Sequence, residues 1–93
     1  MSKTLVFTAT YNEVRNIKKL ISLIYKNFPK ADILVIDDNS PDLTYKLLKK
    51  LKKKYKNLKI KLRDKKYGLD SAHKFAYDFA KKNGYVKLIT MDA

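Results

Sequence analysis

Cysteine and tryptophan are absent from this 93-residue chain, and glycine and proline occur only twice each. Without cysteine the chain forms neither a disulfide nor a thiolate metal site, which fits a reducing compartment. Two glycines, Gly68 and Gly84, are too few for a Walker-type or Rossmann glycine-rich phosphate loop. No apolar run approaches the roughly 18 residues of a membrane span, and no segment resembles a signal peptide. The predicted location is the cytoplasm, with the cytosolic face of a membrane as the alternative.

Acidic residues are also scarce. The chain has 9 of them and 22 basic residues, which gives a net charge of +13. Twelve basic residues fall between Lys46 and Lys66, where Asp64 is the only acid. Three interpretations are open: a solvated helix face, a surface that meets an anionic membrane, or a surface that meets nucleic acid. Leucines interleaved with the lysines favour the solvated face. Nucleic acid is the weakest of the three, since clustered arginines and nucleic-acid motifs are lacking.

Apolar periodicity predicts four strands that alternate with three helices. Short apolar runs predict strands at residues 4–8, 33–36, 58–62 and 86–91, with the third at an edge of the sheet. Apolar spacings of three and four predict helices over about residues 14–28, 41–55 and 69–83. Pro29 and Gly84 are expected to end the first and third helices. The alternation predicts an α/β domain with a parallel sheet and helices on its faces.

Carboxylates follow two of the predicted strands, Asp37-Asp38 after the second and Asp92 after the fourth. Ligands of parallel α/β sheets bind beyond the carboxyl ends of the strands. Asp37 and Asp38 suit hydrogen bonds from a ribose hydroxyl or base N–H groups, although they can also be turn residues only. A Mg²⁺ or Mn²⁺ ion on a diphosphate needs one or two carboxylates, so Asp92 alone is weak evidence for one.

Two further segments have both a structural and a functional interpretation. Thr10 and Glu13 match a capping box that would open the first helix and needs no ligand. Arg63, Lys65 and Lys66 precede Gly68, so that loop suits phosphates or is a solvated basic turn. The single histidine, His73, has no ligand partner at helical spacing and is expected at the surface or its boundary.

Four segments in order carry a family resemblance: Thr10-Tyr11-Asn12-Glu13 with Asn16-Ile17, Ile36-Asp37-Asp38-Asn39-Ser40-Pro41-Asp42 with Thr44, Gly68-Leu69-x-Ser71-Ala72, and Thr90-Met91-Asp92-Ala93. Together they resemble the amino-terminal half of family 2 inverting glycosyltransferases with a GT-A fold, in particular polyprenol- or dolichyl-phosphate mannosyltransferases. Ala9 stands where the family usually has Pro, and Asp70 replaces the second Gly of its Gly-Leu-Gly segment.

The resemblance implies a three-layer, Rossmann-like half of a GT-A fold. Its four parallel strands would lie in the order 3-2-1-4, with the first and third helices on different faces. Residues 1–93 would form a single nucleotide-sugar-binding domain, truncated at the Asp-x-Asp metal motif. The fourth strand would then have an open apolar edge, which predicts self-association through it.

The same resemblance implies transfer of a sugar, with inversion, from a nucleotide sugar to a polyprenyl phosphate acceptor. GDP-mannose is the first choice of donor and a UDP-sugar the alternative. The implied nucleotide-binding residues are Thr10, Tyr11, Glu13, Asp37, Asp38, Arg63 and Lys66. Asp92 would be the first acid of the motif that holds Mg²⁺ or Mn²⁺, no catalytic residue falls in these 93 residues, and the isolated chain is expected to be inactive. A non-catalytic nucleotide-binding or interaction module and a basic surface-binding protein are the alternatives.

Overall fold

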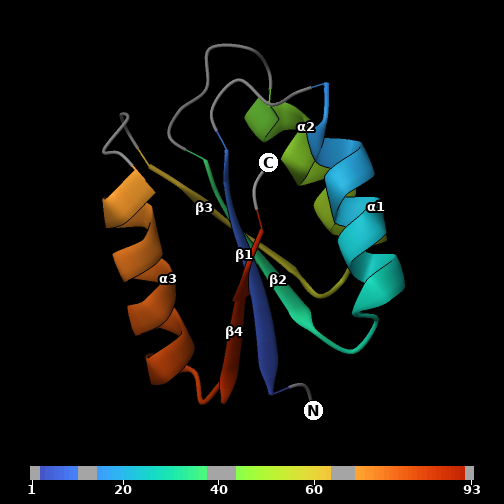
Figure 1. The fold of residues 1–93 in the computed structure, drawn as a ribbon. Helices are drawn as coiled ribbons and strands as arrows, with labels where there is room; N and C mark the ends of the chain where they lie inside the picture. The colour runs from blue at the N-terminus through green and yellow to red at the C-terminus, as the bar shows by residue number, and fades with distance from the viewer. Residues whose placement is uncertain (1–2, 11–14, 38–43, 64–68, 92–93) are drawn as a thin grey trace.

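The computed structural model describes residues 3–10, 15–37, 44–63 and 69–91. Strands and helices alternate in the order β1 (Thr4–Thr10), α1 (Ile17–Asn27), β2 (Asp32–Asp37), α2 (Thr44–Lys54), β3 (Leu58–Leu62), α3 (Leu69–Lys82) and β4 (Lys87–Thr90). The strands form one parallel sheet in the order β3-β2-β1-β4 (Figure 1). The predicted alternation, strand order and edge position of β3 are confirmed.

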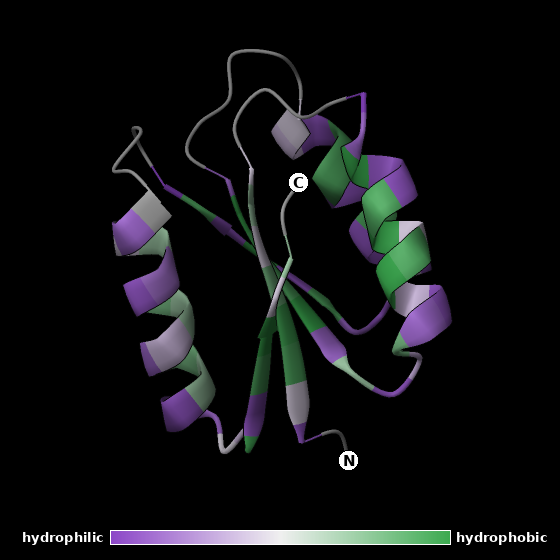
Figure 2. Ribbon diagram, in the orientation of Figure 1, coloured by the Kyte–Doolittle hydropathy of each residue, from purple (hydrophilic) through white to green (hydrophobic). Residues whose placement is uncertain are grey.

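Two apolar clusters, one on each face of the sheet, make a three-layer arrangement. Helices α1 and α2 lie together on one side and α3 on the other (Figure 1). Side chains of β1 alternate between the clusters, with Val6 toward α1 and α2 and with Leu5 and Phe7 toward α3. Helix α3 turns its hydrophobic side to the sheet and its hydrophilic side outward (Figure 2). This division follows from the period of two along a strand and 3.6 along a helix.

The start of the first helix differs from the capping-box prediction. Strand β1 continues through Thr10, and α1 begins only at Ile17. The backbone N–H of Leu20 donates to the carbonyl oxygen of Asn16, 2.9 Å away, in the first turn of the helix. Thr10 therefore does not cap this helix, and its hydroxyl is used instead between strands. Glu13 lies outside the described residues.

The end of α3 confirms the role predicted for Gly84. Its φ is +77°, a left-handed conformation that side chains disfavour. The N–H of Tyr85 donates to the carbonyl oxygen of Ala80 at 3.0 Å, and the N–H of Gly84 to that of Lys81 at 3.4 Å. These bonds satisfy carbonyls that a helix end leaves without partners. The chain then reverses into β4.

Strand β4 is shorter than the predicted 86–91 and spans Lys87–Thr90. Val86 lies just before it with 80% of its surface exposed. The N–H of Met91 still donates to the carbonyl oxygen of Phe7 at 2.9 Å, so the chain follows β1 for one residue beyond the strand.

Within the described ranges, no helix is both long and apolar enough to cross a membrane.

Candidate functional site

The last residues of β1 and β2 are joined through their side chains. Thr10 and Asp37 are register partners in the parallel pair. The hydroxyl Oγ1 of Thr10 donates to Oδ1 of Asp37 over 2.9 Å. The relative exposure of Thr10 is 3% and that of Asp37 is 0%. A buried carboxylate requires hydrogen-bond donors, because desolvation otherwise disfavours its charged form. The bond therefore stabilises the polar edge where the two strands end.

Arg63 extends this edge to the third strand and to α3. It follows β3 directly, and its backbone N–H donates to the carbonyl oxygen of Asp37 at 2.8 Å. Its guanidinium Nη1 donates to Oγ of Ser71, in the first turns of α3, at 2.9 Å. The residue is largely buried, with a relative exposure of 9%. A guanidinium keeps its charge in such a place and offers five donors. The carboxyl edge thus combines an acid, a hydroxyl and a fixed cation.

Of the predicted site residues, the structure brings Thr10, Asp37 and Arg63 to one edge of the sheet. The other predicted residues lie outside the described residues: Tyr11, Glu13, Asp38, Lys66 and Asp92.

Ser71 was not predicted as a site residue, although the bond from Arg63 places it beside the edge. Its position in the Gly68-Leu69-x-Ser71-Ala72 segment was the signal that could have identified it. His73 is exposed, and its ring meets that of Phe7 edge-on with centroids 5.3 Å apart. That contact agrees with the expected place at the surface boundary.

A metal site does not emerge from the described part of the chain. No group of three or more His, Cys, Asp or Glu side chains that could hold an ion lies among those residues. Oδ1 of Asp37 accepts the hydrogen bond from Thr10. The predicted metal acid, Asp92, lies outside the described ranges. The described residues therefore do not by themselves fit a divalent cation.

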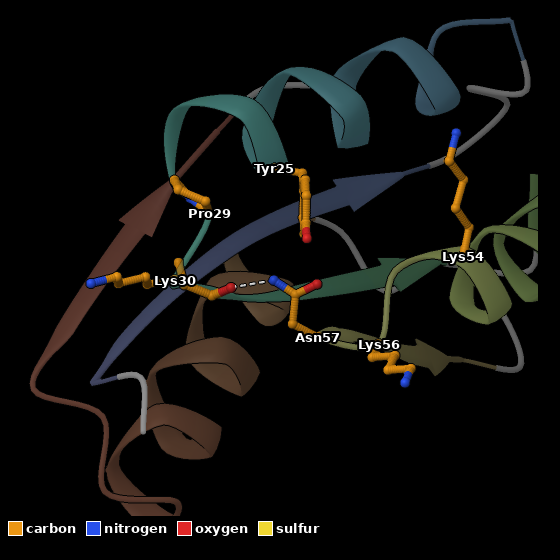
Figure 3. A pocket seen from close by; sticks show the side chains of 7 residues that line it. Tyr25, Pro29, Lys30, Lys54, Lys56 and Asn57 are labelled. Carbon is orange, nitrogen blue, oxygen red and sulfur yellow. Dashed lines mark hydrogen bonds between the residues drawn. The ribbon is translucent and has the colours of Figure 1, made fainter.

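Two cavities lie at the amino ends of the strands, opposite the polar edge. One of about 370 Å³ lies between the end of α1 and the start of β3, with Tyr25 and Asn57 in its wall (Figure 3). The other, of about 300 Å³, lies between α3 and β4 and includes Tyr85 and Val86. Neither includes Thr10, Asp37 or Arg63. The carboxyl edge is distinguished by its paired polar side chains and its place in a parallel sheet.

The sequence model of glycosyl transferase family 2 matches residues 5–93. The chain belongs to glycosyl transferase family 2. It is 35% identical over 92 residues to a polyprenol monophosphomannose synthase of Mycolicibacterium smegmatis, covering 98% of this chain and 35% of that protein. It is 29% identical over 91 residues to an undecaprenyl-phosphate mannosyltransferase of Micrococcus luteus, covering 98% and 37%. This family 2 chain therefore spans about a third of the length of these relatives.

A third relative is a dolichol-phosphate mannosyltransferase of Pyrococcus furiosus, 39% identical over 72 residues, with 75% of this chain and 20% of that protein covered. Among solved structures, the family 2 fold described above resembles a mannosyltransferase of Pyrobaculum calidifontis in complex with GDP-Man and Mn²⁺. The TM-score is 0.75 at 22% identity, over 83% of this chain and 24% of the other. This likeness confirms the predicted GT-A-like arrangement of the four strands and three helices.

Proposed function

We propose that residues 1–93 form the nucleotide-sugar-binding unit of a family 2 mannosyltransferase that uses GDP-mannose as donor and a polyprenyl phosphate as acceptor. The observation that carries the proposal is the Thr10–Asp37–Arg63 edge, at the carboxyl ends of a parallel sheet where α/β folds bind nucleotides. The names of the relatives support mannose and a lipid phosphate acceptor. The solved relative supports the donor, because it contains GDP-Man.

The burial of the edge residues indicates which of them hold the strands in place and which residues contact the nucleotide. Asp37 and Thr10 have almost no exposed surface. In the proposal they hold the ends of β1 and β2 in place as part of the nucleotide site. Contacts to the base and ribose then fall to their neighbours Tyr11, Glu13 and Asp38.

A cation at this edge suits the diphosphate of the donor. Arg63 presents a guanidinium that is held by Ser71, and guanidinium groups match the geometry of phosphate oxygens. Lys66 would add a second cation from the same connection. Asp92 would contribute a carboxylate to a bound Mg²⁺ or Mn²⁺, and such an ion stabilises charge on a departing diphosphate.

The acceptor chemistry makes modest demands on the protein. A lipid phosphate already carries the negative charge of the attacking oxygen, so a strong general base is less necessary. In-line attack at the anomeric carbon would invert its configuration. No side chain of this chain is proposed to act as the catalytic base.

Calorimetric titration with GDP and with UDP, in the presence of Mn²⁺, tests the proposal. GDP should bind more tightly than UDP, and Asp38→Ala should weaken binding by about 1–3 kcal/mol because polar partners lose their acceptor. Asp78→Ala is the matched control, since it removes the same charge from an exposed position on α3. Circular dichroism should be nearly unchanged in both variants.

Two results would contradict the proposal. Equal affinity of wild type and Asp38→Ala would mean that Asp38 is only a turn residue. Binding of neither nucleotide to the wild-type chain would favour a non-catalytic interaction module. Titration with a DNA duplex separates nucleotide-sugar binding from a basic protein that binds nucleic acid.

A further inference from the structure

The layer formed by α1 and α2 carries positive charge without any acid. Helix α1 contains three lysines and α2 contains six, and neither helix contains Asp or Glu. Helix α3, on the other face of the sheet, mixes Asp70 and Asp78 with its lysines. The charge of +13 is therefore distributed unevenly over the fold. Like charges on neighbouring helices repel one another and weaken the folded state. Such an arrangement suits a surface that meets an anionic partner.

The lysines of this layer are exposed because the inner positions are apolar, although Lys52 donates to the carbonyl oxygen of Leu58 at 3.1 Å. Ile17, Ile21 and Ile24 of α1 and Leu48 and Leu51 of α2 are buried against the sheet. Helices α1 and α2 also contact each other, so their outer sides are adjacent (Figure 1). We call the exposed residues on these outer sides the cationic face; they are Lys18, Lys19, Lys26, Lys46, Lys49, Lys50 and Lys53.

One apolar side chain lies among these cations. It is Leu23 of α1, which is 50% exposed. An open hollow of about 480 Å³ on the outer side of α1 is lined by Arg15, Lys18, Lys19, Ser22, Leu23 and Lys26. Helices that lie in the interface of a bilayer combine lysines with exposed apolar side chains such as leucine. A partly exposed leucine surrounded by cations therefore suits a surface that meets both the charged headgroups and the apolar part of a bilayer.

Three further lysines, beside the cavity between α1 and β3, are not gathered around one small ligand. Lys30, Lys54 and Lys56 line this cavity, but their ammonium groups point to different sides (Figure 3). Tyr25 instead points toward Asn57 in the middle of the cavity (Figure 3). Diverging cations over a broad layer match an extended array of negative charges better than a single phosphate group.

We propose that the cationic face binds the surface of an anionic phospholipid bilayer, with Leu23 inserted among the headgroups. Lysines near such a surface are attracted by its negative potential. Nucleic acid is also an extended anion, but it fits the cationic face less well than a bilayer does. Arg15 is the only arginine beside this face, and an exposed leucine has no role on a phosphate backbone. The inference rests on charge and exposure in the α1–α2 layer and is independent of nucleotide binding at the carboxyl edge.

Co-sedimentation of the purified chain with vesicles tests the inference. Vesicles of phosphatidylcholine with about 30% phosphatidylserine should bind the chain, and pure phosphatidylcholine vesicles should bind it at least about ten-fold more weakly. Binding to the mixed vesicles should fall as salt rises from about 0.05 to about 0.5 M, since screening shortens the range of the attraction.

Two triple variants with equal charge change locate the contact. The α1 triple variant combines Lys18→Glu, Lys19→Glu and Lys26→Glu. It should weaken binding to the mixed vesicles at least about ten-fold, because each lysine near such a surface changes the affinity about five-fold. Lys74→Glu with Lys81→Glu and Lys82→Glu reverses three exposed charges on α3 and should weaken it far less. Thermal melting followed by circular dichroism checks that both variants fold. Equal losses would show a general charge effect and overturn the inference.

A third variant tests the apolar part and separates a bilayer from nucleic acid. Leu23→Asn leaves the charge unchanged and should weaken binding to the mixed vesicles several-fold. Fluorescence anisotropy with a labelled DNA duplex at the same salt provides the comparison. The inference would be overturned in favour of nucleic acid by a combination of three results. The chain would bind the duplex more tightly than the mixed vesicles, the α1 triple variant would lose this binding, and Leu23→Asn would leave it unchanged. Binding to neither would overturn it in favour of a solvated surface.

Discussion

The hydroxyl of Thr10 donates a buried hydrogen bond to the carboxylate of Asp37, 2.9 Å away and 27 residues further along the chain. The bond joins the carboxyl ends of β1 and β2, where the proposed nucleotide site begins. It also explains why Thr10 ends a strand instead of capping a helix. This buried polar pair ends an otherwise apolar part of the sheet.

Replacing Thr10 by valine should destabilise the fold. Thr10→Val removes a donor from a carboxylate that has no exposed surface. Loss of a hydrogen bond to a buried charged group costs about 1–3 kcal/mol. Urea unfolding followed by circular dichroism measures the change in the free energy of unfolding. An unchanged midpoint would show that the bond contributes nothing to the stability of the edge.

The same substitution two residues earlier is expected to have the opposite sign. Thr8 is also fully buried on β1, yet its Oγ1 has no hydrogen-bond partner among the residues that the structure describes. Thr8→Val removes this costly buried hydroxyl. The free energy of unfolding should stay equal or rise by up to about 1 kcal/mol. A loss of more than that in the urea experiment would mean that the hydroxyl does have a partner in solution.

The environment of Tyr85 predicts how the free energy of unfolding changes at alkaline pH. Burial, then its hydrogen bond to the carboxylate of Asp32 and the negative charge of that group, raise the pKa of Tyr85 well above its ordinary value. The folded state therefore favours the protonated phenol. Its contribution to stability is complete below about pH 10, the pKa of an unfolded tyrosine, and is lost as the pH rises beyond it.

Urea unfolding at a series of pH values tests this linkage with Tyr85→Phe. The difference in free energy of unfolding between wild type and variant should be largest below about pH 10 and should shrink above it. The rest of the chain is the same in both proteins, so the difference isolates Tyr85. A difference that does not depend on pH would contradict the raised pKa.

Strand β4 is an edge strand of the sheet in the described part of the chain, and the 93-residue chain is expected to self-associate through it. Lys87 and Met91 donate their N–H groups to the carbonyl oxygens of Lys3 and Phe7 in the direction of β1. The N–H of Thr90 then points away from β1, because bonding directions alternate along a strand. Leu88 and Ile89 are only half-buried, and exposed apolar edges pair with other chains.

Thr90→Pro should reduce this association, since it removes an outward donor and leaves the bonds to β1 in place. Thr90→Val keeps the donor and serves as the control. Sedimentation equilibrium at moderate salt measures both. A wild-type chain that remains monomeric at high concentration would show that the edge does not pair.

The 93-residue chain is expected to bind nucleotide without transferring sugar. It matches only 35% and 37% of the length of two mannosyl-transferring relatives. Stabilising the transition state requires a complete metal clamp and a positioned acceptor, which the donor side alone does not supply. Assay with GDP-mannose and a polyprenyl phosphate should show no turnover above a metal-free control. Metal-dependent product formation would refute this prediction.

The amino-acid sequence by itself determined the order of the elements, their inner faces and the strand ends that carry polar residues. Apolar spacing of two or of three and four residues is a local property, so the spacing alone assigns Ala72, Ala76 and Ala80 to the inner side of α3. The end of that helix at Gly84 is equally local. The family also followed from short segments read in order along the chain, and the family match over residues 5–93 confirms it.

Tertiary structure decided the relations between residues that are distant in sequence. The bond from Thr10 to Asp37 depends on the register between β1 and β2, and the bond from Arg63 to Ser71 on where α3 starts beside β3. Thr10 does not cap a helix as its capping-box pattern predicts. The strand register places its hydroxyl beside the buried carboxylate of Asp37, which needs a donor. The sequence showed an excess of lysine, but only the packing of α1 beside α2 collected those lysines on one face.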